Sequence, residues 1–253
     1  MTNTSRIALI TGANRGLGRS AALELARDGV DILITYRANA AEADAVVAEI
    51  AALGRTGRAL QLDTSAVASF SAFADELRGA LGETGYERLD LLVNNAGTGL
   101  HAAFADTTEE QFDEMIDVHL KGVFFLTQRL LPLLADGASI VNVSSGLARF
   151  SLPGSSAYAM AKGGVEVLTR YLALELADRG ITVNTIAPGA IATDFRGGAV
   201  RDNPQARDAV AAMTALGRVG EADDIGTAVA GLFASRSRWI TGQRIEASGG
   251  MHV

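Results

Sequence analysis

The sequence contains no cysteine, which excludes disulfide bonds and thiolate chemistry. Histidine is scarce as well: the three histidines are scattered along the chain, so a zinc site is not expected. No hydrophobic run is long enough to cross a bilayer, and residues 1–6 lack the apolar stretch of a signal peptide. We therefore expect a cytoplasmic protein with no metal and no membrane partner.

Positive charge is in the minority. The 22 basic and 29 acidic residues give a net charge of −7, which argues against nucleic acid or an anionic membrane as the main partner. Hydrophobic residues make up 48% of the 253 positions, enough to bury a large core. Because the chain shows no repeats, low-complexity tracts or linkers, we expect residues 1–253 to form a single domain.

Short apolar runs alternate with longer segments of helical period along the whole chain. This alternation predicts a doubly wound α/β fold of the Rossmann type, in which helices cover both faces of a parallel sheet of about seven strands. The expected strands are 7–10, 32–36, 59–62, 89–93, 140–143, 182–186 and 243–246. The expected helices are 17–27, 40–53, 69–81, 108–134, 156–177 and 222–234, with a further mobile helix over 201–213.

Several glycine-rich or polar segments directly follow predicted strands. The carboxyl ends of parallel strands lie at one edge of a sheet, where such sheets bind ligands. We therefore expect these segments to share one crevice. They are the loop 11–18, Asp63, 94–97, Ser145 and 188–189.

The loop 11–18 carries glycines in the spacing G-x-x-x-G-x-G between a strand and a helix. Glycine there lets the backbone approach a pyrophosphate, which the helix N-terminus stabilises. Sites for NAD carry an acid about 20 residues further on, but here the second strand ends in Tyr36 and Arg37. Together with Arg15, Arg37 suits a ribose 2′-phosphate and favours NADP(H) over NAD(H), unless both arginines are only solvated surface charges.

Ser145, Tyr158 and Lys162 form the second motif. Tyr158 and Lys162 are four residues apart and share a helix face. A phenol beside an ammonium can donate or accept a proton, and a serine hydroxyl can hold the reacting oxygen. Moving a phenol pKa from about 10 towards 7 requires about 4 kcal/mol, for which Lys162 and the oxidised cofactor are the expected sources. We expect the neighbouring Ser144 to have a structural role.

Taken together, these motifs resemble the short-chain dehydrogenase/reductase family in its short, single-domain form, over essentially the whole chain. The resemblance implies an oxidoreductase that interconverts a ketone and a secondary alcohol, with Ser145, Tyr158 and Lys162 as catalytic residues and a homotetrameric assembly. It also implies a set of cofactor-binding residues. These are Gly12, Asn14, Arg15, Gly16, Leu17, Gly18, Tyr36, Arg37, Asp63, Thr64, Asn95, Ala96, Gly97, Tyr158, Lys162, Pro188, Gly189, Ile191 and Thr193.

One position departs from the family pattern. Where the family usually has an active-site asparagine, this sequence has His119. His119 lies on a predicted apolar stripe, which favours a hydrogen-bonded core residue. The alternative hypothesis is a catalytic contribution, in which His119 holds a water near Lys162.

The expected substrate pocket is mostly apolar, which favours a nonpolar or aryl ketone or the corresponding alcohol. Its predicted wall consists of Leu100, Leu147, Phe150, Leu152, Phe195 and a substrate lid around 190–216. Arg149 could pair with a substrate carboxylate, although a surface role is favoured.

Two other functions stay open. Many relatives are 3-oxoacyl-[acyl-carrier-protein] reductases, but the turn 135–138 lacks the basic residues expected for an acidic carrier; Arg179 could still contact one. A non-catalytic NADP(H)-binding sensor on the same fold would be expected to lose the tyrosine or the lysine, and this chain keeps both.

Overall fold

A computed structural model, which describes residues 6–234 and 238–253, contains one parallel sheet in the order β3-β2-β1-β4-β5-β6-β7. Its strands are β1 (Arg6–Ile10), β2 (Val30–Tyr36), β3 (Gly57–Gln61), β4 (Leu89–Asn94), β5 (Leu134–Val143), β6 (Thr182–Pro188) and β7 (Arg244–Ala247). The strand order reverses between β1 and β4, and a sheet of this type binds its ligand at that point. The predicted doubly wound fold is confirmed.

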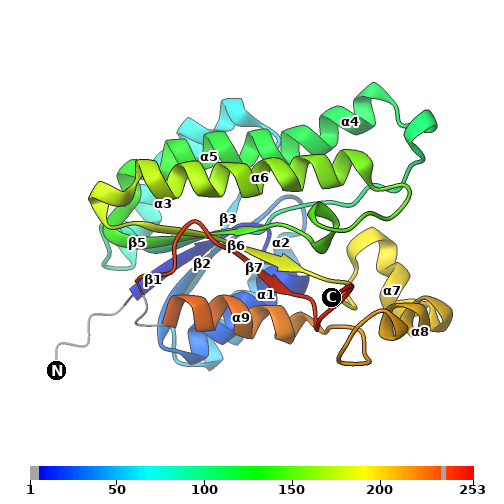
Figure 1. Cartoon of the computed structure of the whole chain (residues 1–253). Helices are drawn as coiled ribbons and strands as arrows, with labels where there is room; N and C mark the ends of the chain where they lie inside the picture. The colour runs from blue at the N-terminus through cyan, green and yellow to red at the C-terminus, as the bar shows by residue number, and fades with distance from the viewer. Residues whose placement is uncertain (1–5, 235–237) are drawn as a thin grey trace.

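Helices cover both faces of the sheet (Figure 1). On one face lie α1 (Gly16–Arg27), α2 (Ala40–Ala52) and α9 (Ala222–Ala234). On the other lie α3 (Phe70–Glu83), α4 (Glu109–Ile116), α5 (Gly122–Leu130) and α6 (Ser156–Glu175). Each layer encloses its own hydrophobic core, represented by Ile32 and Leu25 on the first face and by Leu77 and Leu126 on the second. Strands buried on both faces explain the near-continuous apolar runs of the sequence.

The helix predicted over 108–134 is present over Glu109–Leu133, but it is not one regular α-helix. Between α4 and α5 the turn Asp117–Lys121 is widened to a π-helix, and after α5 a short 3₁₀ turn at Leu131–Leu133 leads into β5. Pro132 lacks the N–H that a continuing helix needs. Gly122, at the end of the π turn, packs directly against the loop after β3. A Cβ at this position would collide with the carbonyl oxygen of Thr64, so only glycine allows the two segments to lie this close. The π turn contains His119, and such turns are frequent at functional sites.

The helix predicted over 201–213 is also divided. The structure has α7 (Ala199–Asp202) and α8 (Pro204–Ala212), with Asn203 between them in an extended conformation. The Asn203 side chain accepts hydrogen bonds from the backbone N–H groups of Gln205 and Ala206, and Pro204 occupies the first turn of α8. A second helix therefore begins at Pro204, where the sequence pattern predicted one continuous helix.

The remaining predicted elements are present, with their ends shifted by a few residues. The N-terminal residues 1–5, in the stretch where no signal peptide was expected, lie outside the described residues. Within residues 6–234 and 238–253, no helix has the length and apolar character needed to cross a membrane. The same residues hold no cluster of three or more His, Cys, Asp or Glu side chains that could bind a metal ion.

Candidate active site

The glycine loop is shaped for a ligand that approaches the backbone. Gly12 and Gly16 have φ values of +63° and +58°, in the left-handed region that favours glycine. Apart from its neighbours along the chain and the backbone of its own helix, no atom of the described residues lies within 4 Å of the place where a Gly16 side chain would begin. Helix α1 begins there without a side-chain cap and without an acidic residue in its first turn. Its free N–H groups and open approach fit the pyrophosphate of a dinucleotide.

The loop after β4 holds the glycine loop in place. The Asn95 side-chain amide donates to the carbonyl oxygens of Thr11 at 2.8 Å and of Gly12 at 3.2 Å. In return, the Thr11 hydroxyl oxygen accepts from the backbone N–H groups of Asn95 and Ala96, each at 3.0 Å. A Cβ at Gly18 would lie 2.5 Å from the Asn95 amide nitrogen, so only glycine fits there. The structure thus brings together Gly12, Gly18, Asn95 and Ala96 as predicted.

The two arginines expected at the 2′-phosphate have different neighbours. Arg37 lies near Asp63. Burial raises the pKa of Asp63, but the hydrogen bonds from Ser65 and the charge of Arg37 outweigh this effect and bring the pKa below its usual range. Arg15 is largely exposed and lies 3.8 Å from the Asp194 carboxylate. The case for a 2′-phosphate therefore rests more on Arg37 than on Arg15.

The other predicted cofactor residues belong to strand ends, to the loops that follow them or to the first turn of α1. Asn14 donates to Glu42 at 2.6 Å, and Gly189 donates its N–H to Ala247 at 3.3 Å. Leu17 and Tyr36 pack on the core beside α1, Thr64 lies against Gly122, and Gly97 lies against His119. Pro188 is the last residue of β6. In the loop after β6, Ile191 pairs with Gly220, and the Thr193 hydroxyl accepts a hydrogen bond from the Phe195 N–H.

Tyr158 and Lys162 lie on α6, and Ser145 follows the end of β5. Both α6 side chains are buried: 6% of Tyr158 and 4% of Lys162 is exposed. Burial raises the pKa of Tyr158 to about 12, against the opposing effects of a hydrogen bond with Ser145 and of the Arg196 charge. The phenol is therefore protonated at neutral pH and can act as an acid.

Lys162 donates a 2.6 Å hydrogen bond from Nζ to the carbonyl oxygen of Val143. Burial lowers the pKa of Lys162 to about 7, so the amine is only partly charged at neutral pH. In the protein by itself, burial thus favours the neutral forms of both Tyr158 and Lys162. The expectation that Lys162 and the oxidised cofactor together bring the pKa of Tyr158 towards 7 concerns the cofactor-bound protein and stays a prediction.

His119 is buried in the π turn with its ring edge-on to the Tyr158 ring, the centroids 5.1 Å apart. Its Nε2 lies 2.7 Å from the Thr98 carbonyl oxygen and 3.3 Å from the Thr98 backbone nitrogen. The shorter contact, with the carbonyl oxygen, favours the tautomer that is protonated at Nε2. Nδ1 is then a buried acceptor without a partner. Burial, assisted by the Lys162 charge, lowers the pKa of His119 to about 2, so the imidazole is neutral at physiological pH.

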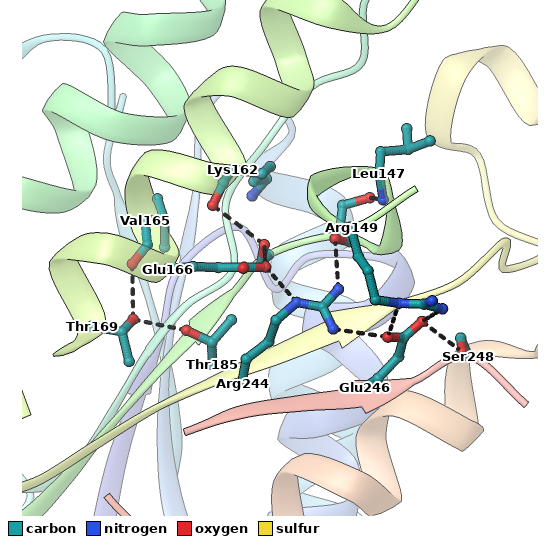
Figure 2. A network of polar contacts seen from close by, with 12 residues as sticks. Leu147, Arg149, Lys162, Val165, Glu166, Thr169, Thr185, Arg244, Glu246 and Ser248 are labelled. Atoms are coloured by element: carbon teal, nitrogen blue, oxygen red, sulfur yellow. Dashed lines mark hydrogen bonds and ion pairs between the residues drawn. The ribbon is translucent and has the colours of Figure 1, made fainter. Parts of the chain in front are cut away.

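Behind Ser145 and Lys162, a polar network joins α6 to β7 (Figure 2). Ser144 donates to the Glu166 carboxylate at 2.7 Å and to the Lys162 carbonyl oxygen at 3.3 Å, the structural role expected of it. Arg244 donates to Glu166 at 2.7 Å and to the Ser145 carbonyl oxygen at 3.3 Å. This network fixes the backbone on both sides of the candidate catalytic groups.

Arg149 belongs to the same network and is not available to a substrate carboxylate. It donates to both carboxylate oxygens of Glu246, at 2.7 and 2.8 Å, and to the carbonyl oxygens of Met251 and His252. Burial raises the pKa of Glu246, but hydrogen bonds from Arg149, Arg244 and Ser248 bring it down to about 2. The favoured surface role of Arg149 is thus the anchoring of the C-terminal segment.

The predicted apolar wall is assembled in part. Leu100 and Leu147 pack against a buried cluster of Met115, Ala157 and Tyr158, and the Phe195 ring lies 5.8 Å from the Tyr158 ring. Phe150 instead packs on His252 at 4.8 Å, and Leu152 is 40% exposed. Leu100, Leu147 and Phe195 therefore define the wall beside the phenol.

Three residues near the candidate site were missed from the sequence: Arg196, Glu166 and Arg244. Glu166 is four residues after Lys162 on the same helix, a spacing that could have identified it. Arg196 and Arg244 lie far from Tyr158 and Lys162 in the sequence, and no local pattern points to them.

Comparison with known proteins identifies the family of the chain. A family model described as enoyl-(acyl carrier protein) reductase matches residues 12–252. The 3-oxoacyl-[acyl-carrier-protein] reductase FabG of Staphylococcus aureus is 38% identical over 253 residues, covering 98% of this chain and 99% of its own. The chain belongs to the short-chain dehydrogenase/reductase family and is an oxidoreductase of that family.

Two solved structures are similar over nearly their whole length. The reductase LugOII, which catalyses keto-reduction at C1 during lugdunomycin biosynthesis, has a TM-score of 0.93 and 41% identity, with 99% of each chain covered. The angucycline C-6 ketoreductase LanV, solved with bound NADP, has a TM-score of 0.92 and 36% identity, covering 98% of this chain and 95% of its own.

Proposed function

We propose that this protein is an NADP(H)-dependent ketoreductase that interconverts a ketone and a secondary alcohol. The observation that carries the proposal is the meeting of Ser145, Tyr158 and Lys162 at the strand ends, beside a glycine loop built for a pyrophosphate. When bound, NADPH supplies the hydride. The bound NADP of LanV and the position of Arg37 near Asp63 support this cofactor.

In the reduction direction, Tyr158 donates the phenolic proton to the carbonyl oxygen as the carbon is reduced. The high pKa of the buried phenol keeps that proton in place until negative charge develops on the substrate. The Ser145 hydroxyl hydrogen-bonds the same oxygen and stabilises the charge. In the reverse direction Tyr158 takes the proton back, and a charged Lys162 stabilises the phenolate.

A substrate on an acyl carrier protein is the second candidate, favoured by the similarity to FabG. Arg179, the basic residue considered for carrier contact, is engaged: it hydrogen-bonds Asp136 and the carbonyl oxygens of Leu131 and Leu134. The free small ketone is favoured because this part of the surface offers an acidic carrier little free positive charge. A non-catalytic NADP(H) sensor is disfavoured, since both Tyr158 and Lys162 are present and buried at the site.

We further propose that the chain is one domain with a lid over 190–216, and that it forms a homotetramer. Phe124, Phe125 and Tyr171 are large apolar or aromatic side chains exposed on α5 and α6, which supports an interface there. Leu168, on the same helix, is buried within the chain and does not belong to this surface.

The ketoreductase proposal is tested with Tyr158→Phe and the matched control Tyr171→Phe, a largely exposed tyrosine on the same helix. Tyr158→Phe is expected to lower kcat for ketone reduction by about a hundredfold or more while the calorimetric Kd for NADPH stays within about threefold. Tyr171→Phe is expected to behave as wild type. Retention of most activity in Tyr158→Phe would show that the phenol is not the acid.

A further inference from the structure

Arg196 has a backbone conformation that arginine rarely adopts. Its φ of 52° and ψ of 42° lie in the left-handed region, and the next two residues, Gly197 and Gly198, also have positive φ. Non-glycine residues in this region cluster at ligand-binding sites, where the surroundings hold them. The turn directs the Arg196 side chain from the start of the lid towards the candidate active site.

The Arg196 side chain spans two other walls of that site. Its Nη2 donates to the Leu100 carbonyl oxygen at 2.5 Å and to the Ser155 hydroxyl at 3.1 Å. Gly99 leaves room for it, because a Cβ at Gly99 would lie 2.6 Å from the Arg196 Cγ. The guanidinium is therefore fixed between the loop after β4 and the start of α6.

The guanidinium lies over the candidate acid. Its Cζ is 5.8 Å from the centroid of the Tyr158 ring. Within the described residues no carboxylate forms a salt bridge with Arg196, and its buried Nε has no hydrogen-bond partner. Nε is too deeply buried for a ligand oxygen to reach it. Both hydrogen bonds of the half-buried side chain use Nη2, and Nη1 has no hydrogen-bond partner within the described residues, so Nη1 is the donor that a ligand oxygen can meet.

We propose, resting on the ketoreductase function above, that Arg196 determines substrate specificity by hydrogen-bonding a second oxygen of the substrate. Because the guanidinium lies over the ring whose hydroxyl holds the reacting carbonyl, this oxygen is close to the first one. A β-keto ester, or an aryl ketone with an oxygen on the neighbouring ring carbon, has this arrangement. A simple alkyl ketone lacks it and leaves the Arg196 donor without an acceptor.

The test compares two ketones of equal chain length, ethyl acetoacetate and methyl pentyl ketone, which lacks the ester oxygens. Arg196→Met is expected to lower kcat/KM for ethyl acetoacetate at least tenfold and for methyl pentyl ketone less than threefold, mainly through KM. Arg196→Lys keeps a cation and is expected to recover part of the loss. The control is Arg218→Gln, an exposed arginine beyond the lid that pairs with Asp224, and it is expected to match wild type.

A binding measurement separates this proposal from the ketoreductase function. Ligand NMR with NADP⁺-loaded protein is expected to show ethyl acetoacetate binding at least fivefold more weakly to Arg196→Met than to wild type, whether or not either ketone is turned over. If wild type reduces neither ketone, the proposed function fails while the binding result still decides the role of Arg196. Equal losses for both ketones, or unchanged binding, would overturn the specificity role.

Discussion

The neutral, buried imidazole of His119 makes the folding stability depend on pH in a way that one substitution removes. In the folded chain the pKa of His119 is about 2, whereas an unfolded histidine titrates near 6.5. Below pH 6.5 the unfolded chain therefore binds a proton that the folded chain does not. The free energy of unfolding falls as the pH falls, by about 1.4 kcal/mol for each pH unit.

The expected magnitude is about 1.4 kcal/mol at pH 5.5 and about 2.7 kcal/mol at pH 4.5, relative to pH 7.5. His119→Asn abolishes this proton uptake. When the pH is lowered from 7.5, the free energy of unfolding of the variant should therefore fall less than that of wild type, and the difference between the two falls should equal these two values. Taking the difference between pH values within each variant cancels the packing change caused by the smaller side chain. The assay is urea unfolding at the three pH values, followed by circular dichroism.

The control is His101→Asn, which removes an exposed imidazole and is expected to follow wild type at each pH. The same pKa predicts that the kcat–pH profiles of wild type and His119→Asn have the same shape, because the imidazole does not ionise in the assay range. Equal losses of stability in wild type and His119→Asn between pH 7.5 and 4.5 would refute the reasoning. A profile that shifts in His119→Asn would return the imidazole to the proton relay.

Three further outcomes are expected. Relative to Lys162→Met, wild type should gain about 3.5 kcal/mol of unfolding free energy from pH 7 to pH 10, because the unfolded lysine keeps its proton up to about 10.5 and the folded one loses it near 7. A difference that stays constant with pH would contradict the depressed pKa of the buried lysine. Arg37→Asp should lower kcat/KM with NADPH at least tenfold and leave that with NADH within threefold, and an unchanged ratio would remove Arg37 from the 2′-phosphate site. Light scattering at micromolar concentration should give about four times 26.3 kDa, and Phe124→Glu should reduce this mass; a wild-type particle of 26.3 kDa would refute the tetramer.

Much of the fold is predictable from local pattern. Apolar runs separated by helical segments define a parallel doubly wound sheet, and glycine or polar residues after each strand locate the crevice. The pairing of Tyr158 with Lys162 follows from the helical repeat alone. The π turn within 108–134 and the break at Asn203 within 201–213 were not predicted, because an amphipathic stripe does not reveal such local changes of backbone geometry.

What the sequence by itself determined is the class of fold, the residues at the strand ends and the chemistry these residues can perform. Tertiary structure alone decided how buried each group is and which distant residue faces it. Burial sets the pKa of Tyr158 near 12, of Lys162 near 7 and of His119 near 2. It also places Arg196 over the phenol. The physical reason is that desolvation and long-range contacts depend on the packing of elements that are far apart in the chain, whereas a sequence pattern reports only neighbours along it.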